Sequence, residues 1–418
     1  MTGDYVNSEA PKHKTWIGAM GLVLIVYLLL AYGAYSVFTS HIPSGNDFYP
    51  RWKGTRALLL EAKDPYSDEV TLEIQQGMYG RPAREDEDQV AFAYPLYVTL
   101  FIFPFAFFSY AQAQALWLSA LVVLAVGAAL LALQITDWKP SPVGLIAVSV
   151  WCLLFYPSAR SIDLGQISIV VLTLVALALW AIRERRDLLA GSCLALATVK
   201  PQMAFLLIPF LLLWATAQRR RRVLGGFAAS FAILLLVPSA VLPTWIPSFF
   251  ASMSRYQSYT RLYREGRSPL GVLVDCLFPS TISSWVAVLT SVVLVGCLIY
   301  AWVRALRVHR EVPRALILTI IVTLLVPAET GTSNQVLLLL PLVYWLSRWS
   351  KRRWLGISLS LILLLGPWLV FLSTVQGNLE HPIMALPLPV ITLAMLWWAR
   401  EETDGQLGLT RRQTPPEG

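Results

Sequence analysis

Residues 110–134 read YAQAQALWLSALVVLAVGAALLALQ and contain no charged side chain. A helix needs about 20 consecutive apolar residues to cross a hydrocarbon core about 30 Å thick. This stretch therefore predicts a membrane-spanning helix. Eleven other stretches share its apolar character: 15–38, 142–157, 166–182, 188–199, 201–215, 223–242, 282–303, 313–327, 335–347, 354–372 and 384–399. Together they predict an all-α polytopic membrane protein, a bundle of about 12 transmembrane helices.

The composition of the chain excludes several classes of protein. Of its 418 residues, 56% are hydrophobic and 14% are charged, whereas a soluble protein carries about 25% charged residues. So few charges cannot cover a water-facing surface, which excludes a soluble globular enzyme and a disordered protein. Cys152, Cys193 and Cys297 fall inside apolar stretches, and Cys276 stands alone in a loop. The four cysteines therefore form no disulfide framework.

The net charge of +8 indicates orientation in a membrane rather than binding of nucleic acid, because the arginines form short clusters between apolar stretches. Residues 92–108 (FAYPLYVTLFIFPFAFF) are equally apolar but contain Pro95 and Pro104. If this segment does not cross, most Lys and Arg residues of the short loops fall on one side, which is then cytoplasmic. If it crosses, the cluster at 219–222 lies outside. We therefore expect a re-entrant or surface-lying segment and cytoplasmic termini, with thirteen spans and atypical charge placement as the alternative.

The chain is expected to form one membrane domain over residues 1–400, since it has no internal repeat and no soluble domain longer than a loop. Residues 39–109 are expected to be a first extracytoplasmic loop that holds juxtamembrane helices and the re-entrant segment. Residues 243–281 are expected to form a second long extracytoplasmic loop, and residues 401–418 a disordered cytoplasmic tail. No phosphate-binding loop, dinucleotide-binding glycine pattern, H-E-x-x-H helix or CxxC pair occurs, so we expect neither a metal nor a cofactor.

Asp47 is the first candidate functional residue, because it follows the first apolar stretch near the lipid interface. Ionisable groups at the edges of membrane cavities are commonly functional. The structural alternative is a helix N-cap, where Asp and Asn are favoured, and the two roles can coexist. Arg51, one helical turn on, is placed to keep Asp47 ionised.

Two other acidic features of the first loop favour structural interpretations. Asp64 and Pro65 predict a turn followed by a new helix start. The acidic run at 85–88 predicts a solvated face, since its spacing does not match a set of oxygen ligands for a metal.

A second set of polar candidates lies at the predicted outer ends of later spans. An anionic head group such as a lipid phosphate would need cationic partners, and those placed to converge on it are Lys200, Arg160, Arg255 and Arg261. The residues expected to line a substrate site are Tyr49, Asp163, Gln166, Glu329 and Asn334. The structural alternative is that Lys200 extends along the apolar surface to water and that Arg160 pairs with Asp163.

Five segments together resemble glycosyltransferase family 87. They are NDFYPRWKGTRALLLEAKDPY at 46–66, AYPLYVTLFIFPF at 93–105, LGQISIVVLTLVALAL at 164–179, DLLAGSCLALATVKPQMAFLLIPFLLL at 187–213 and QVLLLLPLV at 335–343. The resemblance runs over roughly residues 15–350. No single motif is specific, so the order and spacing of the segments carry it.

The resemblance implies a GT-C-like fold, a bundle of about a dozen helices with juxtamembrane helices in the first outer loop. The family contains polyprenyl-phosphate-mannose-dependent α-mannosyltransferases and related bacterial enzymes, which use an acidic residue of that loop as catalytic base. Asp47 is the matching position, and Gly165-Gln166 and Lys200-Pro201 match recurring family positions. Members often carry a histidine before the LLLP helix, whereas the corresponding segment here reads AETGTSNQ, which puts the contribution of that loop in doubt.

The implied activity is transfer of a sugar, with mannose expected, from a polyprenyl-phosphate donor to a lipid or glycan hydroxyl. The chain would be integral to a bacterial plasma membrane, in contact with its lipids, and would act on the extracytoplasmic side without nucleic acid. Asp47 would remove the hydroxyl proton while the phosphate leaves with inversion, stabilised by basic residues. A polytopic transporter or lipid flippase and a non-catalytic assembly subunit are the alternative functions.

Overall fold

The computed structural model describes residues 12–42, 46–85, 87–263, 268–327, 330–349, 353–375 and 380–398, with side chains except at 12–17, 256–263 and 353. Within these ranges the chain forms helices and no strand. The predicted tail at 401–418 lies outside the described residues.

The helices follow the apolar stretches closely. In the first half of the chain they are α1 (Lys12–Ala34), α2 (Phe48–Glu61), α3 (Asp68–Tyr79), α4 (Thr99–Ile102), α5 (Tyr110–Ile135), α6 (Pro142–Leu154), α7 (Tyr156–Asp163), α8 (Ser168–Arg183), α9 (Asp187–Ala197), α10 (Pro201–Ala204) and α11 (Leu207–Ala217). In the second half they are α12 (Arg221–Val241), α13 (Trp245–Tyr263), α14 (Pro269–Leu277), α15 (Ser280–Arg307), α16 (Val312–Leu325), α17 (Leu339–Trp349), α18 (Arg353–Thr374) and α19 (Pro387–Trp398). A π-helical turn, η1 (Tyr35–Thr39), extends α1, and the 3-10 segments are η2 (Leu96–Val98), η3 (Phe103–Phe105), η4 (His309–Glu311), η5 (Thr332–Leu338) and η6 (Pro382–Ala385).

Several helices begin at serine caps that satisfy the free N–H groups of a first turn. The Ser67 hydroxyl accepts a hydrogen bond from the backbone N–H of Val70 at the start of α3. Ser109 and Gln112 form a capping box at the start of α5. The carboxylate of Asp64 accepts a bond of 2.8 Å from the Tyr66 N–H, which is the turn predicted before α3.

Each of the twelve predicted spans contains a helix, but the count of about 12 transmembrane helices is not confirmed. Five described helices are long and apolar enough to cross a membrane: Gly18–Thr39, Tyr110–Ile135, Arg221–Val241, Ser280–Arg307 and Trp354–Thr374. The pair α6 and α7, bent by 60°, makes a sixth if it is one span. The other apolar helices have 10–17 residues, and at 1.5 Å per residue the shorter ones fall well below about 30 Å.

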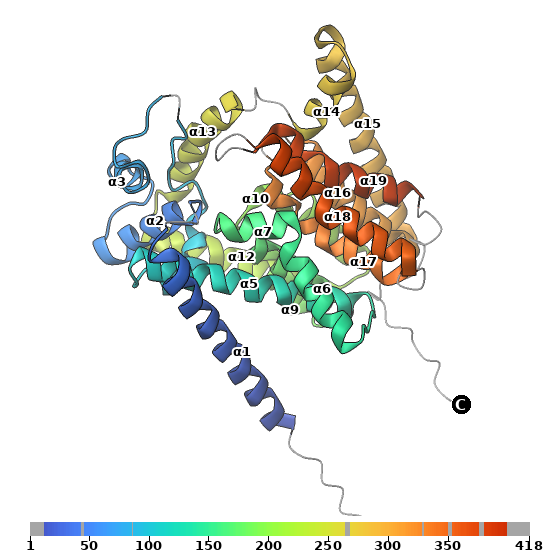
Figure 1. The fold of residues 1–418 in the computed structure, drawn as a ribbon, viewed down its shortest axis with the longest axis horizontal. Helices are drawn as coiled ribbons and strands as arrows, with labels where there is room; N and C mark the ends of the chain where they lie inside the picture. Colours follow the sequence, from blue (N-terminus) through green and yellow to red (C-terminus); the bar gives the residue numbers. More distant parts are fainter. Residues whose placement is uncertain are drawn as a thin grey trace, which may run out of the picture.

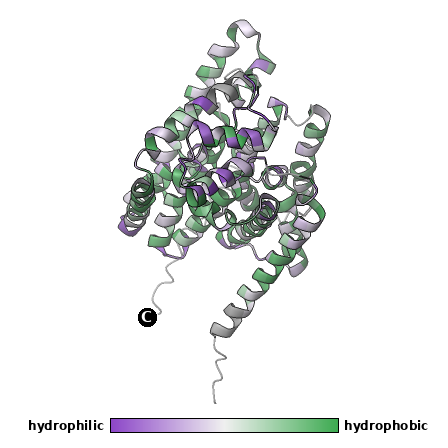
Figure 2. Ribbon diagram, turned by 90° about the vertical axis from the view of Figure 1, so that its left-hand side faces the viewer, coloured by the Kyte–Doolittle hydropathy of each residue, from purple (hydrophilic) through white to green (hydrophobic). Residues whose placement is uncertain are grey.

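The long helices at the periphery turn apolar side chains outward. In α1 and in α15 only 6% of the apolar window is buried, and α1 runs away from the bundle as a mostly hydrophobic helix (Figures 1 and 2). Leu22 and Leu29 of α1 are 62% and 66% exposed. Apolar surface of this extent is incompatible with water, so the chain is an integral membrane protein.

Two glycines allow α9 and α12 to pack with their backbones in contact. A Cβ on Gly191 would lie 2.1 Å from the carbonyl oxygen of Val223, and a Cβ on Gly226 would lie 2.5 Å from that of Leu188. Small residues are the usual means by which membrane helices approach so closely.

Arginines join several helix ends on one side of the bundle. Arg183 at the end of α8 donates 2.9 Å to the carbonyl of Ile135 at the end of α5 and pairs with Asp137. Arg220, just before α12, donates 2.8 Å to the carbonyl of Ile182 and pairs with Asp187 at the start of α9. Because α8 and α9 are antiparallel neighbours, the start of α8 and the end of α9 meet at the opposite side.

The segment 92–108 contacts α2 at both of its ends. At its start, Arg51 of α2 donates 2.7 Å to the hydroxyl of Tyr94. Near its end, Trp52 and Arg56 of α2 donate to the carbonyls of Phe105 and Ala106. The segment is built from η2, α4 and η3, and Pro104 lies within η3, just after the end of α4.

Replacing the two glycines at the contact between α9 and α12 should destabilise the fold. We expect Gly191→Ala and Gly226→Ala to lower the free energy of unfolding by about 1–3 kcal/mol or more, because each methyl group meets a backbone carbonyl that cannot rotate away. Thermal unfolding of the purified protein in detergent measures the effect.

The matched control is Gly225→Ala in the same helix, where an added Cβ meets nothing within 4 Å. Alanine should be neutral there or stabilise the helix by about 0.5–1 kcal/mol. Equal unfolding temperatures for Gly225→Ala and Gly226→Ala would contradict the proposed packing.

Candidate active site

A cavity of about 520 Å³ lies where the start of α2, the segment 90–95, α10, α13 and the residues before and within η5 meet. Four residues predicted from the sequence line it, namely Asp47, Gln166, Lys200 and Asn334. The other polar residues of its wall are Asn46, Arg51, Tyr94, Gln202 and Ser333. Its apolar wall includes Phe205, Phe249 and Met253.

Asp47 occupies the N-cap position of α2, but its side chain makes no capping hydrogen bond. Its backbone N–H donates 3.1 Å to the carbonyl of Leu164, which ties the start of α2 to the turn before α8. The carboxylate instead accepts a hydrogen bond at Oδ2 from Nε2 of Gln166. The carboxylate therefore faces the cavity rather than its own helix.

Gln166 joins the carboxylate of Asp47 to the ammonium group of Lys200. Its Oε1 accepts a hydrogen bond of 2.8 Å from Lys200 Nζ, while its Nε2 donates to Asp47. The charges on both sides fix which end of the amide is which, since only the oxygen can accept from an ammonium. The carboxylate of Asp47 and the ammonium group of Lys200 are thus linked through a neutral amide.

Lys200 is a buried cation with only neutral partners among the described residues. It is 4% exposed, and besides Gln166 its Nζ donates 2.7 Å to the hydroxyl of Ser168. It lies in the turn between α9 and α10, outside the helices long enough to cross. Burial, with the positive charge of Arg51 adding to it and that of Asp47 opposing it, lowers the pKa of Lys200 to about 7. A buried ammonium without a carboxylate is a favourable place for an anion.

The turn at Gly165 orders this side of the cavity. Its φ of +66° is accessible to glycine at little cost. Its carbonyl accepts bonds of 2.8 Å from both Arg51 and Trp117. The guanidinium of Arg51 is therefore directed at Gly165 and at Tyr94, and no ion pair joins it to Asp47 within the described chain.

Arg160 and Asp163 are predicted site residues that do not line the cavity. Arg160 pairs with Asp163 and with Glu380, each at 2.7 Å. Glu380 also accepts from the hydroxyls of Tyr156 and Thr332. The pair with Asp163 is the alternative that the sequence offered for Arg160. The network also joins α7 to the part of the cavity wall that contains η5.

Tyr49 and Arg255 also lie away from the cavity wall. The ring of Tyr49 packs 4.7 Å from that of Tyr110, centroid to centroid. Arg255 forms an exposed ion pair of 2.8 Å with Asp68, linking α13 to α3. Glu329 and the side chain of Arg261 lie outside the described residues.

The sequence interpretation missed two residues near the site, Tyr94 and Asp88. Glu85 is exposed as expected for a solvated face, but that prediction is wrong for Asp88, whose Oδ1 is buried and has no partner in the described structure. Burial and then the charge of Asp47 raise the pKa of Asp88 to about 6. The one available signal was the apolar Val90 that follows, where the chain turns inward.

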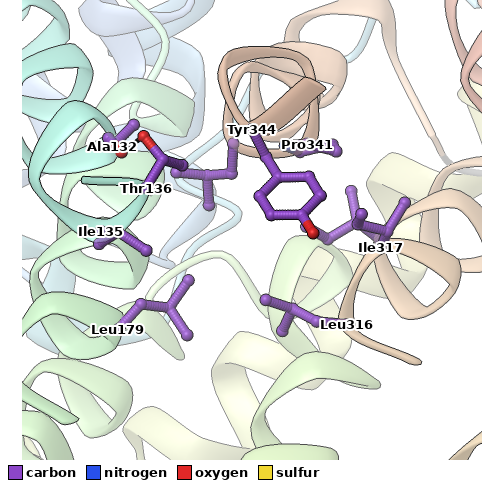
Figure 3. A pocket seen from close by; sticks show the side chains of 10 residues that line it. Ala132, Ile135, Thr136, Leu179, Leu316, Ile317, Pro341 and Tyr344 are labelled. Atoms are coloured by element: carbon purple, nitrogen blue, oxygen red, sulfur yellow. Dashed lines mark hydrogen bonds between the residues drawn. The ribbon is translucent and has the colours of Figure 1, made fainter. Parts of the chain in front are cut away.

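A second cavity, between α5, α8, α16 and α17, is far smaller. It measures about 20 Å³, enough for about one water molecule. Figure 3 shows Ile135, Leu179, Leu316 and Tyr344 turned toward the same gap. Its apolar wall offers little chemistry. Across the described ranges, no three His, Cys, Asp or Glu side chains group as a metal site would need.

Comparison with known proteins supports the resemblance seen in the sequence. The model of the family described as glycosyltransferase family 87 matches residues 92–269, a range that contains Tyr94, Gln166 and Lys200. No curated protein and no solved structure matches the chain. The match to glycosyltransferase family 87 over residues 92–269, together with apolar helices suited to a membrane and a polar cavity at the helix ends, indicates a membrane glycosyltransferase.

Proposed function

We propose that the protein transfers a sugar, with mannose expected, from a polyprenyl-phosphate donor to a hydroxyl group of a lipid or glycan acceptor. The observation that carries the proposal is the pair of opposite charges on one cavity wall. The Asp47 carboxylate and the Lys200 ammonium both line it, and Gln166 lies between them. Transfer with inversion needs a base for the attacking hydroxyl and a cation for the leaving phosphate.

The reaction follows from these positions. Asp47 accepts the proton of the acceptor hydroxyl as that oxygen forms a bond to the anomeric carbon. The bond from the anomeric carbon to the phosphate oxygen breaks, and its electron pair leaves with the polyprenyl phosphate. Lys200 donates to a phosphate oxygen as its charge grows, and Asp47 later releases its proton to water. A cation preorganised in a buried site stabilises this charge more than water does.

The other wall of the cavity supports a lipid-linked donor. Phe205 is 44% exposed and lies five residues after Lys200, and Phe249 and Met253 of α13 line the same side. These side chains give the first isoprenoid carbons an apolar surface next to the phosphate position. A sugar carried on lipid phosphate also requires no nucleotide-binding domain.

The distribution of charge supports an extracytoplasmic active site in a GT-C-like bundle. Arg183 and Arg220 join helix ends on the side opposite to the cavity, and clustered arginine favours the cytoplasmic face. The two contacts of the segment 92–108 with α2 support a re-entrant path, since α2 lies on a single side.

Asp47→Asn tests the assignment of the base. The amide can still accept from Gln166 through its oxygen, so the fold should persist, but it cannot take a proton. We expect transfer to fall by about 10²–10⁴-fold. Radiolabelled donor, a panel of candidate acceptors and purified protein in detergent provide the assay.

The matched control is Glu69→Gln, which removes one carboxylate from the exposed face of α3. It should retain transfer within about twofold, because a solvent-exposed ion pair contributes little. Turnover by Asp47→Asn at the level of this control would refute the role of Asp47.

The lowered pKa of Lys200 predicts a pH dependence of donor use. Lys200 carries its charge below about pH 7 and loses it above, whereas a phosphodiester stays anionic. We expect kcat/KM for the donor to fall by about tenfold per pH unit above pH 7, since this ratio reports groups of the free enzyme. Initial rates at low donor concentration between pH 5.5 and 9 measure it.

Lys200→Met should reduce kcat/KM at pH 6 and abolish this fall, because methionine has similar length and no titrating group. A wild-type kcat/KM that stays constant from pH 6.5 to 8.5 would contradict the role of Lys200 in binding the phosphate.

A further inference from the structure

Gln166 forms a hydrogen-bonded bridge between Asp47 and Lys200. Its amide accepts from Lys200 Nζ at 2.8 Å and donates to Asp47 Oδ2. The structure contains no ion pair between Asp47 and Lys200 in the ranges it describes. In a buried site, opposite charges attract far more strongly than in water, so their separation needs a physical cause.

We propose that Gln166 is a positioning residue that keeps Asp47 and Lys200 from pairing with each other. The inference rests on the proposed function, for which both charges must be available to substrates. A direct ion pair would neutralise the base and the phosphate-binding cation together, and each substrate would have to break it before binding.

The hydrogen bonds show how one amide performs this role. It occupies Oδ2 of Asp47 and therefore leaves Oδ1 as the oxygen that can accept a proton from the acceptor. On its other side, Lys200 uses two of its three N–H donors on Gln166 and Ser168. The third donor remains for a phosphate oxygen.

The backbone holds the amide in this place. Gln166 follows Gly165 in the turn before α8, and its N–H donates 2.7 Å to the carbonyl of Ser161. The carbonyl of Gly165 is held by Arg51 and Trp117. Gln166, which acts as a spacer between the two charges, is therefore fixed to α2 and α5 independently of them.

Two substitutions distinguish a spacer from a residue that merely fills space. Gln166→Ala opens the gap and lets the flexible Lys200 side chain reach Asp47. Gln166→Leu keeps nearly the same volume but removes both hydrogen bonds. The charged groups that act on Lys200 are Arg51 and Asp47, both from the start of α2, so contact with Asp47 alone would raise the pH at which Lys200 loses its proton.

The experiment measures acylation of Lys200 against pH by mass spectrometry, with an amine-reactive ester and purified protein in detergent. The wild type should give a midpoint near pH 7. Gln166→Ala should shift the midpoint upward by at least one unit, and Gln166→Leu should not. A midpoint in Gln166→Ala equal to or below the wild type, or the same upward shift in both variants, would overturn the proposal.

Transfer assays on the same variants complete the test. We expect both variants to lower kcat by about 10–100-fold. Only Gln166→Ala should raise the pH above which kcat/KM for the donor begins to fall. The acylation midpoint needs no transfer, so the spacer inference can be judged even if the wild type transfers no sugar. An active wild type with unshifted midpoints would instead refute the inference alone.

Discussion

The buried ammonium of Lys200 is the constraint on which the arrangement of the site depends. A charge removed from water is costly unless hydrogen bonds or an opposite charge compensate. Here the compensation comes from two neutral oxygens, those of Gln166 and Ser168, with Asp47 one amide away. Such a group is only partly stabilised in the free protein, and in the proposed reaction the phosphate of the donor supplies the missing anion. Under this proposal, the energetic cost of burying Lys200 favours binding of the donor.

The fold places this cation through elements that carry no chemistry themselves. The antiparallel pair of α8 and α9 brings the turns at Gln166 and Lys200 to one side, and the glycine contact between α9 and α12 fixes that pair against the bundle. Gly165, in a left-handed conformation, presents its carbonyl to α2 and α5. The carboxylate of Asp47 is thus positioned by a backbone contact to Leu164 rather than by its own helix.

Much of this could be predicted from the sequence, because apolar stretches define the helices and polar residues at their ends define the cavity. Asp47, Gln166, Lys200 and Asn334 were predicted in this way, and all four line the cavity. Arg160 could not be assigned, since its partner Glu380 lies 220 residues away. Asp88 was read as solvated because local charge does not reveal where a loop turns inward. The number of spans was not settled either, because breaks at Phe155 and Lys200 divide apolar stretches into helices shorter than a bilayer.

The most direct measurement is an experimental structure with a non-transferable analogue of the lipid-phosphate sugar. The account predicts a phosphate oxygen within hydrogen-bonding distance of Lys200 Nζ, apolar carbons against Phe205, and the sugar between the phosphate and Oδ1 of Asp47. Gln166 should remain between the two charges. A head group bound at Arg160 or Arg255, with the cavity beside Lys200 empty, would contradict the account.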